Sequence, residues 1–126
     1  MKTAMIIASD AGARTAGIIR EELGKEVDLV SVWDRSGCVR IDSITDFTLR
    51  HFGDYEAFVF IGAMGICVRA IAPCVTSKYA DPAVVNVDAT GHFVVSVLAG
   101  HVGGANALTE RLARILGAQP VVTTQS

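Results

Sequence analysis

The segment Leu98-Ala-Gly-His-Val-Gly-Gly-Ala-Asn-Ala-Leu108 joins two runs of different periodicity. The apolar run that ends at Leu98 has the length and β-branched content of a strand, whereas apolar residues after Gly103 recur at helical spacing. The segment is therefore predicted to be a strand end, a tight turn and a helix N-terminus. Glycine lets backbone approach a ligand closely, and the first amides of a helix lack partners and carry partial positive charge. The turn is a candidate anion or oxyanion site, although glycines alone equally suit close packing of a helix on a sheet.

Length and composition indicate one globular domain with a real core. The 126 residues are 51% hydrophobic and 19% charged, as in soluble globular proteins. The formal net charge of -2 and the scattered Lys and Arg residues argue against nucleic acid as a partner. No apolar run approaches the roughly 20 residues that cross a bilayer, and the run after Met1-Lys-Thr is too short for a secretory signal. We therefore expect a cytoplasmic protein with no membrane partner.

The three cysteines include no Cys-x-x-Cys pair, which suits reduced thiols better than a zinc site or a disulfide framework. Cys67 follows a glycine turn and is a candidate nucleophile. A free cysteine is more often a small core residue, and this is the expectation for Cys67.

Strand and helix patterns alternate along the chain. Strands are predicted over residues 3–8, 27–33, 57–61, 83–88, 92–98 and 120–123, and helices over 10–23, 43–52, 66–72 and 103–116. This order predicts an α/β fold with an open, mostly parallel sheet of about five to six strands and helices on both faces. Asp88-Ala-Thr-Gly91 is a hairpin turn signal, so one β-hairpin is expected over 83–98.

Ligands of such folds bind at the carboxyl edge of the sheet. If strand 93–98 runs parallel to strand 57–61, the hairpin partner of strand 93–98 runs the other way. Asp88 and His92 would then be turn residues at the opposite edge. This arrangement would bring three candidate groups to one edge, namely the Gly62-Ala-Met-Gly65 turn, the loop with Lys78, and His101.

Four motifs follow one another between Phe60 and Asn106. They are Phe60-Ile-Gly-Ala-Met-Gly-Ile-Cys-Val-Arg-Ala-Ile-Ala-Pro73, Ser77-Lys-Tyr-Ala-Asp-Pro-Ala-Val-Val85, Val87-Asp-Ala-Thr-Gly91 and Gly100-His-Val-Gly-Gly-Ala-Asn106. Together they resemble the N-terminal domain of the CbiG family of anaerobic cobalamin biosynthesis. Residues 1–50 resemble it only in strand–helix character. Ala99 stands where the family usually has Ser, which excludes a hydroxyl role there, and Thr123-Thr-Gln-Ser126 stands where the family has Thr-Thr-Ala-Thr-Asp.

The resemblance implies cobalt-precorrin-5A hydrolase activity, in which the δ-lactone of a cobalt-corrinoid is opened and acetaldehyde is released. The cobalt belongs to the substrate, and no metal or organic cofactor of the chain itself is implied. The family's proteins carry a further C-terminal domain and are sometimes fused to a precorrin methyltransferase. Residues 1–126 are therefore expected to be a single α/β domain at the N-terminal part of a longer polypeptide.

Lactone hydrolysis needs a base that activates water and donors that face the carbonyl oxygen. His101 can be the base, with Asn106 orienting water or a substrate carboxylate. The turn glycines Gly100, Gly103 and Gly104 would contact the substrate, the last two through their amides. The acetate and propionate arms of a corrinoid need cationic and amide-rich contacts, for which the candidates are Gly62, Gly65, Arg69 and Lys78. The plainer account makes Arg69 and Lys78 surface residues and Asn106 a helix cap.

Two other functions fit the same residues. The domain could hold the corrinoid or pair with another domain or a second copy while the chemistry lies elsewhere, because an isolated open sheet offers only a shallow cleft for so large a substrate. A general nucleotide- or phosphate-binding domain would use both glycine turns, but neither turn has the Walker lysine or completes the dinucleotide fingerprint.

Overall fold

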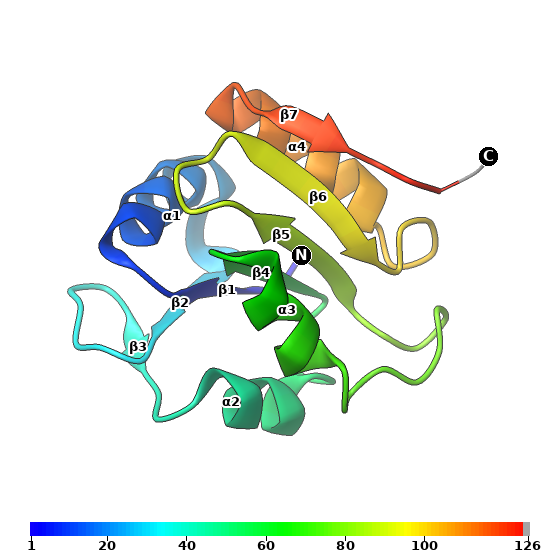
Figure 1. The fold of residues 1–126 in the computed structure, drawn as a ribbon, viewed down its shortest axis with the longest axis horizontal. Coiled ribbons are helices and arrows are strands. Elements are labelled where there is room, and N and C mark those ends of the chain that lie inside the picture. Colours follow the sequence, from blue (N-terminus) through cyan, green and yellow to red (C-terminus); the bar gives the residue numbers. More distant parts are fainter. Residues whose placement is uncertain (125–126) are drawn as a thin grey trace.

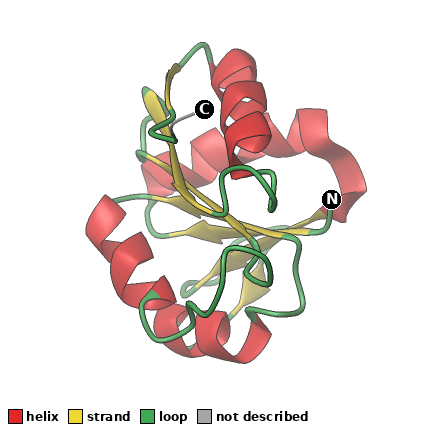
Figure 2. Cartoon of the chain, turned by 90° about the vertical axis from the view of Figure 1, so that its right-hand side faces the viewer, coloured by secondary structure: helices red, strands yellow, loops and turns green. Residues whose placement is uncertain are grey.

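A computed structural model describes residues 1–124 as one sheet with helices on both faces (Figures 1 and 2). The strands are β1 (Thr3–Ile7), β2 (Val27–Ser31), β3 (Val39–Arg40), β4 (Ala57–Ile61), β5 (Ala83–Val87), β6 (Phe93–Leu98) and β7 (Gln119–Val121). The helices are α1 (Asp10–Leu23), α2 (Ile44–His51), α3 (Met64–Ile71) and α4 (Ala105–Leu116), with a short 3-10 turn η1 (Gly24–Glu26). None of the helices in this described part is long and apolar enough to cross a membrane.

The sheet has seven strands in the order β3-β2-β1-β4-β5-β6-β7, with β3 and β7 at its edges. The strands β2, β1, β4 and β5 are parallel neighbours, β6 is antiparallel to β5, and β7 is parallel to β6. The predicted α/β class and the hairpin over 83–98 are confirmed. The structure has one strand more than the expected five to six. This additional strand is β3, which is only two residues long and has both side chains exposed.

Two cores lie on the two faces of the sheet. On one face α1 and α4 pack around Met5, Ile19 and Leu112. On the other face α2 and α3 pack around Phe58 and Phe60. Every residue of β1, β4 and β5 is buried, which explains why their sequences are continuous apolar runs instead of alternating ones.

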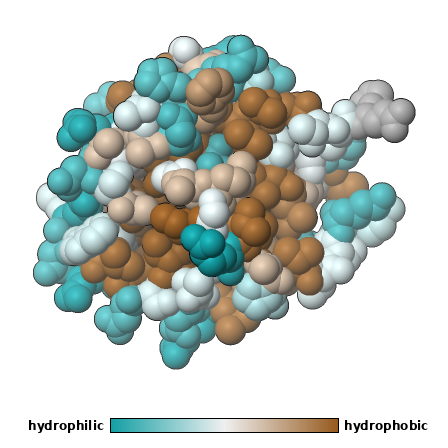
Figure 3. Space-filling model, in the orientation of Figure 1, coloured by the Kyte–Doolittle hydropathy of each residue, from teal (hydrophilic) through white to brown (hydrophobic). Residues whose placement is uncertain are grey.

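Only one face of β6 and β7 carries a helix among the described residues. The helix α4 packs against β5, β6 and β7, whereas α3 packs against β4 and β5. As a result Phe93 is 53% exposed while its neighbour Val94 is fully buried. We call the uncovered side, formed by Phe93, Val95 and Val121, the open face. Val97 points to the same side but packs against the core of Phe58 and Phe60. Hydrophobic residues gather in the middle of this side of the molecule (Figure 3).

The direction of the hairpin corrects one expectation. The strand β5 is parallel to β4, because the intervening helix α3 carries the chain back across the sheet, and β6 is the reversed strand. Leu98 therefore lies beside Val84 at the beginning of β5. The parallel strands end on the left of Figure 1, whereas β6 and β7 end on the right. The expectation that His101 shares an edge with the Gly62–Gly65 turn is wrong.

Candidate functional site

The loop 99–104 between β6 and α4 turns the chain sharply. Ala99 has a φ of +58°, a conformation uncommon for a residue with a side chain. The carbonyl oxygens of Ala99, Gly100 and His101 accept hydrogen bonds at 3.0–3.3 Å from the amides of Ala105, Asn106 and Gly104, respectively. These bonds satisfy amides that a helix start otherwise leaves free. The Gly104 amide, expected to face a substrate, is therefore engaged within the loop.

Two glycines of the loop are required by close packing. A Cβ atom on Gly103 would stand 2.5 Å from the Ala99 Cβ atom, and one on Gly100 would stand 2.7 Å from the Asn106 Oδ1 atom. No hydrogen bond of the amides of Gly100, His101, Val102 and Gly103 is found within residues 1–124, so these four amides of the loop remain as donors for a ligand.

Asn106 ties three elements together. Its Oδ1 atom accepts a hydrogen bond from the Ser96 hydroxyl of β6 at 2.7 Å, and its Nδ2 atom donates to the Thr124 Oγ1 atom at 2.7 Å. Both ends of the side-chain amide are thus engaged. Asn106 holds the loop between β6, the first turn of α4 and the segment after β7.

A cleft of about 330 Å³ opens beside this loop. Its lining residues are Lys78, Tyr79, Ala99, Gly100, His101, Val102 and Thr124. The exposed His101 and the Lys78 side chain, whose Nζ atom lies 5.3 Å from the centre of the Tyr79 ring, share this cleft. The structure therefore brings Lys78 and His101 together as the sequence predicts, and offers an imidazole, an ammonium group and a phenol to one ligand.

The opposite end of the parallel strands from the His101 loop carries Gly62, Gly65 and Arg69. The Gly62 amide donates to the Val87 carbonyl oxygen at 2.8 Å. The Arg69 guanidinium lies against Gly65, with its Nη2 atom 3.3 Å from where a Cβ atom would stand. The edges are separated by the length of β4, roughly 16 Å. Small ligands therefore cannot contact both groups.

Asn86 is a buried polar residue beside the Gly62 turn that the sequence did not lead us to predict as a site residue. It is only 4% exposed, and its Nδ2 atom donates to the Gly62 carbonyl oxygen at 3.3 Å. Its Oδ1 atom is buried without a partner among the described residues. The signal that could have found it is a single amide inside the apolar strand β5.

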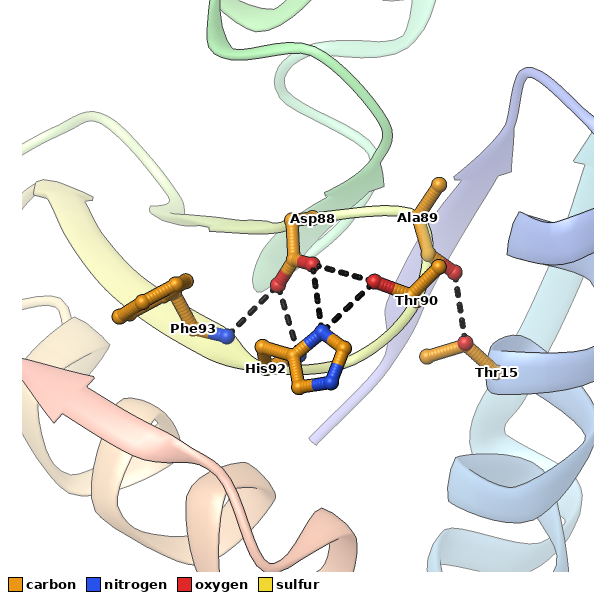
Figure 4. A network of polar contacts seen from close by, with 6 residues as sticks. All are labelled: Thr15, Asp88, Ala89, Thr90, His92 and Phe93. Carbon is orange, nitrogen blue, oxygen red and sulfur yellow. Dashed lines mark hydrogen bonds and ion pairs between the residues drawn. The ribbon is translucent and has the colours of Figure 1, made fainter.

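The turn between β5 and β6 is a compact polar network (Figure 4). The Asp88 carboxylate accepts hydrogen bonds from the amides of His92 and Phe93 at 2.8 and 2.6 Å, and from the Thr90 hydroxyl at 2.9 Å. The Thr15 hydroxyl of α1 donates to the Ala89 carbonyl oxygen at 2.7 Å and ties the turn to the helix. Asp88 and His92 are turn residues as expected, but they lie at the edge that carries Gly62.

Asp88 is expected to make stability depend on pH. Partial burial opposes its ionisation, but the hydrogen bonds from Phe93, Thr90 and His92 outweigh burial and hold the pKa of Asp88 below its ordinary value. The carboxylate therefore stabilises the fold above the unfolded-state pKa of about 4, and this contribution is lost as the pH falls through the lower folded-state value. Urea unfolding of Asp88→Asn at pH 7 should show a loss of about 1 kcal/mol.

The same variant should lose less stability than the wild type between pH 5 and pH 3. The exposed Asp42 provides the control, because Asp42→Asn should leave the pH dependence of the wild type unchanged. A parallel decline of Asp88→Asn and the wild type on acidification would contradict the role given to Asp88.

Cys67 is a core residue. It is a fully buried residue of α3, and burial raises the pKa of the thiol to about 12. The thiolate that a nucleophile needs is therefore absent at neutral pH. Among residues 1–124 no three His, Cys, Asp or Glu side chains are grouped so that they could hold a metal ion.

The fold and its loops define a doubly wound α/β domain whose reversed strand presents a glycine-rich histidine loop. Residues 46–126 match the family described as Cobalamin synthesis G N-terminal, and the chain belongs to this family.

Relatives of the chain include two cobalt-precorrin-5A hydrolases. The protein from Salmonella typhimurium is 59% identical over 73 residues, or 58% of this chain and 21% of the relative. The protein from Priestia megaterium is 49% identical over 75 residues, or 60% of this chain and 20% of the relative. A solved structure from Sulfolobus solfataricus, described as a cobalamin biosynthesis protein G homologue, superposes with a TM-score of 0.75 at 27% identity. The superposition covers 98% of this chain and 37% of the Sulfolobus solfataricus chain. The chain thus spans about a fifth of the length of the two hydrolases, which are larger proteins.

Proposed function

We propose that this chain takes part in the hydrolytic opening of the δ-lactone of cobalt-precorrin-5A, with release of acetaldehyde, and that His101 is the general base. The observation that carries the proposal is the cleft that His101 shares with Lys78 and Tyr79. Family membership supports the choice of reaction, because the two relatives named above are cobalt-precorrin-5A hydrolases and the family match includes the His101 loop.

The proposed step uses the groups of this cleft. The imidazole of His101 removes a proton from water as the water oxygen attacks the lactone carbonyl carbon. The carbon–oxygen bond of the lactone ring then breaks, and the proton passes to the departing oxygen. The products are a hydroxyl group and a carboxylic acid, which loses its proton to solvent. Acetaldehyde leaves when the carbon that bears this hydroxyl becomes a carbonyl carbon: its bond to the macrocycle breaks, the electron pair stays on the macrocycle, and the hydroxyl proton is lost to solvent. The donors for the carbonyl oxygen as it becomes negative are the amides of Gly100, which lines the cleft, and of Gly103 in the same loop, and Lys78 pairs with a carboxylate arm of the corrinoid.

The other predicted site residues take different parts in this proposal. Asn106 acts as a positioning residue, because both ends of its amide are engaged with Ser96 and Thr124. Gly62, Gly65 and Arg69 lie a strand length away and are contacts only for the part of a large substrate that reaches the other edge.

A second candidate function is a corrinoid-binding or assembly domain whose catalytic groups lie elsewhere in a larger protein. Two observations favour it. The chain matches only 20–21% of the length of the two hydrolases, and the open face leaves Phe93 53% exposed where another domain or a second copy could pack. A fused methyltransferase and a cytoplasmic location stay predictions.

An assay of acetaldehyde release from cobalt-precorrin-5A distinguishes the two functions. The 126-residue chain, its His101→Ala variant and the Salmonella typhimurium hydrolase as positive control should be assayed side by side. Under the proposal the chain is active and His101→Ala lowers the rate by roughly 10² to 10⁴. The matched control is His51→Ala, because His51 is a half-buried histidine of α2 that pairs with Asp54; this variant should keep the wild-type rate. An inert chain beside an active hydrolase would favour the assembly function instead.

A further inference from the structure

A second cleft lies at the other edge of the sheet, outside the carboxyl ends of β1 and β2. It encloses about 450 Å³ and is lined by Ala8, Ser9, Asp10, Trp33, Asp34 and Arg35. In Figure 1 this is the left side, where the loop after β2 approaches the beginning of α1. Open α/β sheets bind their ligands outside the carboxyl ends of parallel strands. The cleft therefore lies where folds of this class usually bind a ligand, although it is far from His101.

The loop 32–38 that forms one wall is fixed in place. Two of the contacts that hold it lie within or beside the loop: the Trp33 amide donates to the Ser31 Oγ atom at 3.1 Å, and the Cys38 amide donates to the Arg35 carbonyl oxygen at 3.2 Å. Two others tie the loop to α1: the Arg20 Nη1 atom donates to the Gly37 carbonyl oxygen at 3.1 Å, and the Arg35 Nη1 atom pairs with the Asp10 Oδ1 atom at 2.7 Å. None of these contacts involves the indole ring of Trp33, which is the single tryptophan and is 54% exposed. Tryptophan is usually buried to a much larger extent. A fixed loop thus presents a flat apolar surface to the cleft.

Arg35 supplies the cationic group of the cleft. Its guanidinium lies 5.8 Å from the Trp33 ring centre, and only the Nη1 atom is paired with Asp10. The Nε atom is buried and has no hydrogen-bond partner among the described residues. A ligand in the cleft cannot reach the buried Nε atom. The terminal edge of the guanidinium, formed by Nη1 and Nη2, matches the two oxygens of a carboxylate, while a flat ring can stack on the indole.

The charges of the cleft narrow the choice of ligand. A cationic ring over Trp33 would meet the guanidinium of Arg35, which already lies beside the indole. A phosphate with two negative charges would stand near the carboxylates of Asp10 and Asp34. Among anions, a ligand with a single carboxylate meets less repulsion from Asp10 and Asp34 than a phosphate does. We propose that this cleft binds a flat, conjugated ring that carries a carboxylate, with the ring on Trp33 and the carboxylate on Arg35, at a site separate from the His101 cleft and independent of the lactone reaction.

The single tryptophan gives a direct test, because its indole N–H produces one resolved resonance in a ¹⁵N-labelled sample. The probe is 2-naphthoate, and its neutral analogue 2-naphthamide tests the need for charge. Titration with 2-naphthoate should move the Trp33 resonance with a dissociation constant below about 1 mM, and 2-naphthamide should bind at least tenfold more weakly. An unmoved Trp33 resonance, or equal binding of both probes, would overturn the proposal.

Variants of the ion pair should act in opposite directions. Arg35→Gln removes the guanidinium and should weaken 2-naphthoate at least tenfold, whereas Asp10→Asn frees the Nη1 atom and removes a negative charge and should tighten it. The control is Arg50→Gln, because Arg50 is an exposed arginine of α2 that pairs with Asp46, and this variant should bind as the wild type does. Should Arg35→Gln fail to fold, weaker binding by Asp10→Asn would by itself overturn the proposal.

Discussion

Replacing Gly103 with alanine is expected to lower the free energy of unfolding by roughly 3 kcal/mol. The new Cβ atom would stand 2.5 Å from the Ala99 Cβ atom and 3.0 Å from the Ala99 carbonyl oxygen. Neither atom can move freely, because Ala99 already has a φ of +58° and its carbonyl oxygen accepts from the Ala105 amide. Urea unfolding followed by circular dichroism measures the loss.

The control for this substitution is Gly17→Ala. Gly17 lies inside α1, and nothing stands within 4 Å of the position of its Cβ atom. Alanine is the better helix former, so this variant should gain about 0.5–1 kcal/mol. If Gly103→Ala were as stable as the wild type, the packing of loop 99–104 described above would be wrong.

The second large effect is expected at Val94. This residue of β6 is fully buried under α4, so Val94→Asp places a carboxyl group in an apolar core without a partner. Such a change costs several kcal/mol, and we expect a loss of roughly 4 kcal/mol or more. Thermal unfolding should show a variant that is largely unfolded or melts far below the wild type.

Phe93→Asp is the matched control because it changes the neighbouring residue of the same strand. Phe93 is on the open face and 53% exposed, so the variant should lose about 1 kcal/mol or less. Equal destabilisation by both substitutions would mean that the open face is covered in solution, which a concentration-dependent melting temperature would attribute to a second copy.

The elements that sequence predicts best are those with a strong local cause. The helix α1 begins where the Ser9 hydroxyl accepts from the Gly12 amide and ends before Gly24 at a φ of +78°. Both residues were recognisable as end signals. The strand β3 was missed because two exposed residues form no pattern of burial.

The direction of a strand is not written in its own residues. The runs Ala57–Ile61 and Ala83–Val87 are buried on both faces and would be equally apolar in a parallel or an antiparallel pair. The crossover through α3 makes β5 parallel to β4. This is why Lys78 and His101 could be grouped correctly while the Gly62–Gly65 turn was assigned to the wrong edge.

The Trp33–Arg35 cleft was overlooked for a related reason. The apolar pattern extends the predicted strand to residue 33, whereas β2 ends at Ser31. A strand prediction places Trp33 in the sheet, but the Ser31 hydroxyl accepts from the Trp33 amide and begins the loop instead. Side-chain hydrogen bonds of this kind compete with the strand ladder and are not visible in hydrophobic periodicity.

The two edge strands limit how this protein can associate with itself. Unpaired backbone along a sheet edge invites a strand from another molecule and, in the extreme, fibre growth. Here one edge is the two-residue β3, and the other is the three-residue β7, whose central Pro120 has no N–H group to donate. Both edge strands are therefore poor templates for strand addition, and the parts of β2 and β6 that extend past them, residues 27–29 and 96–98, are short. Any assembly of this domain is therefore expected to be built through side chains on its faces, and its resistance to amyloid-like aggregation should depend on Pro120.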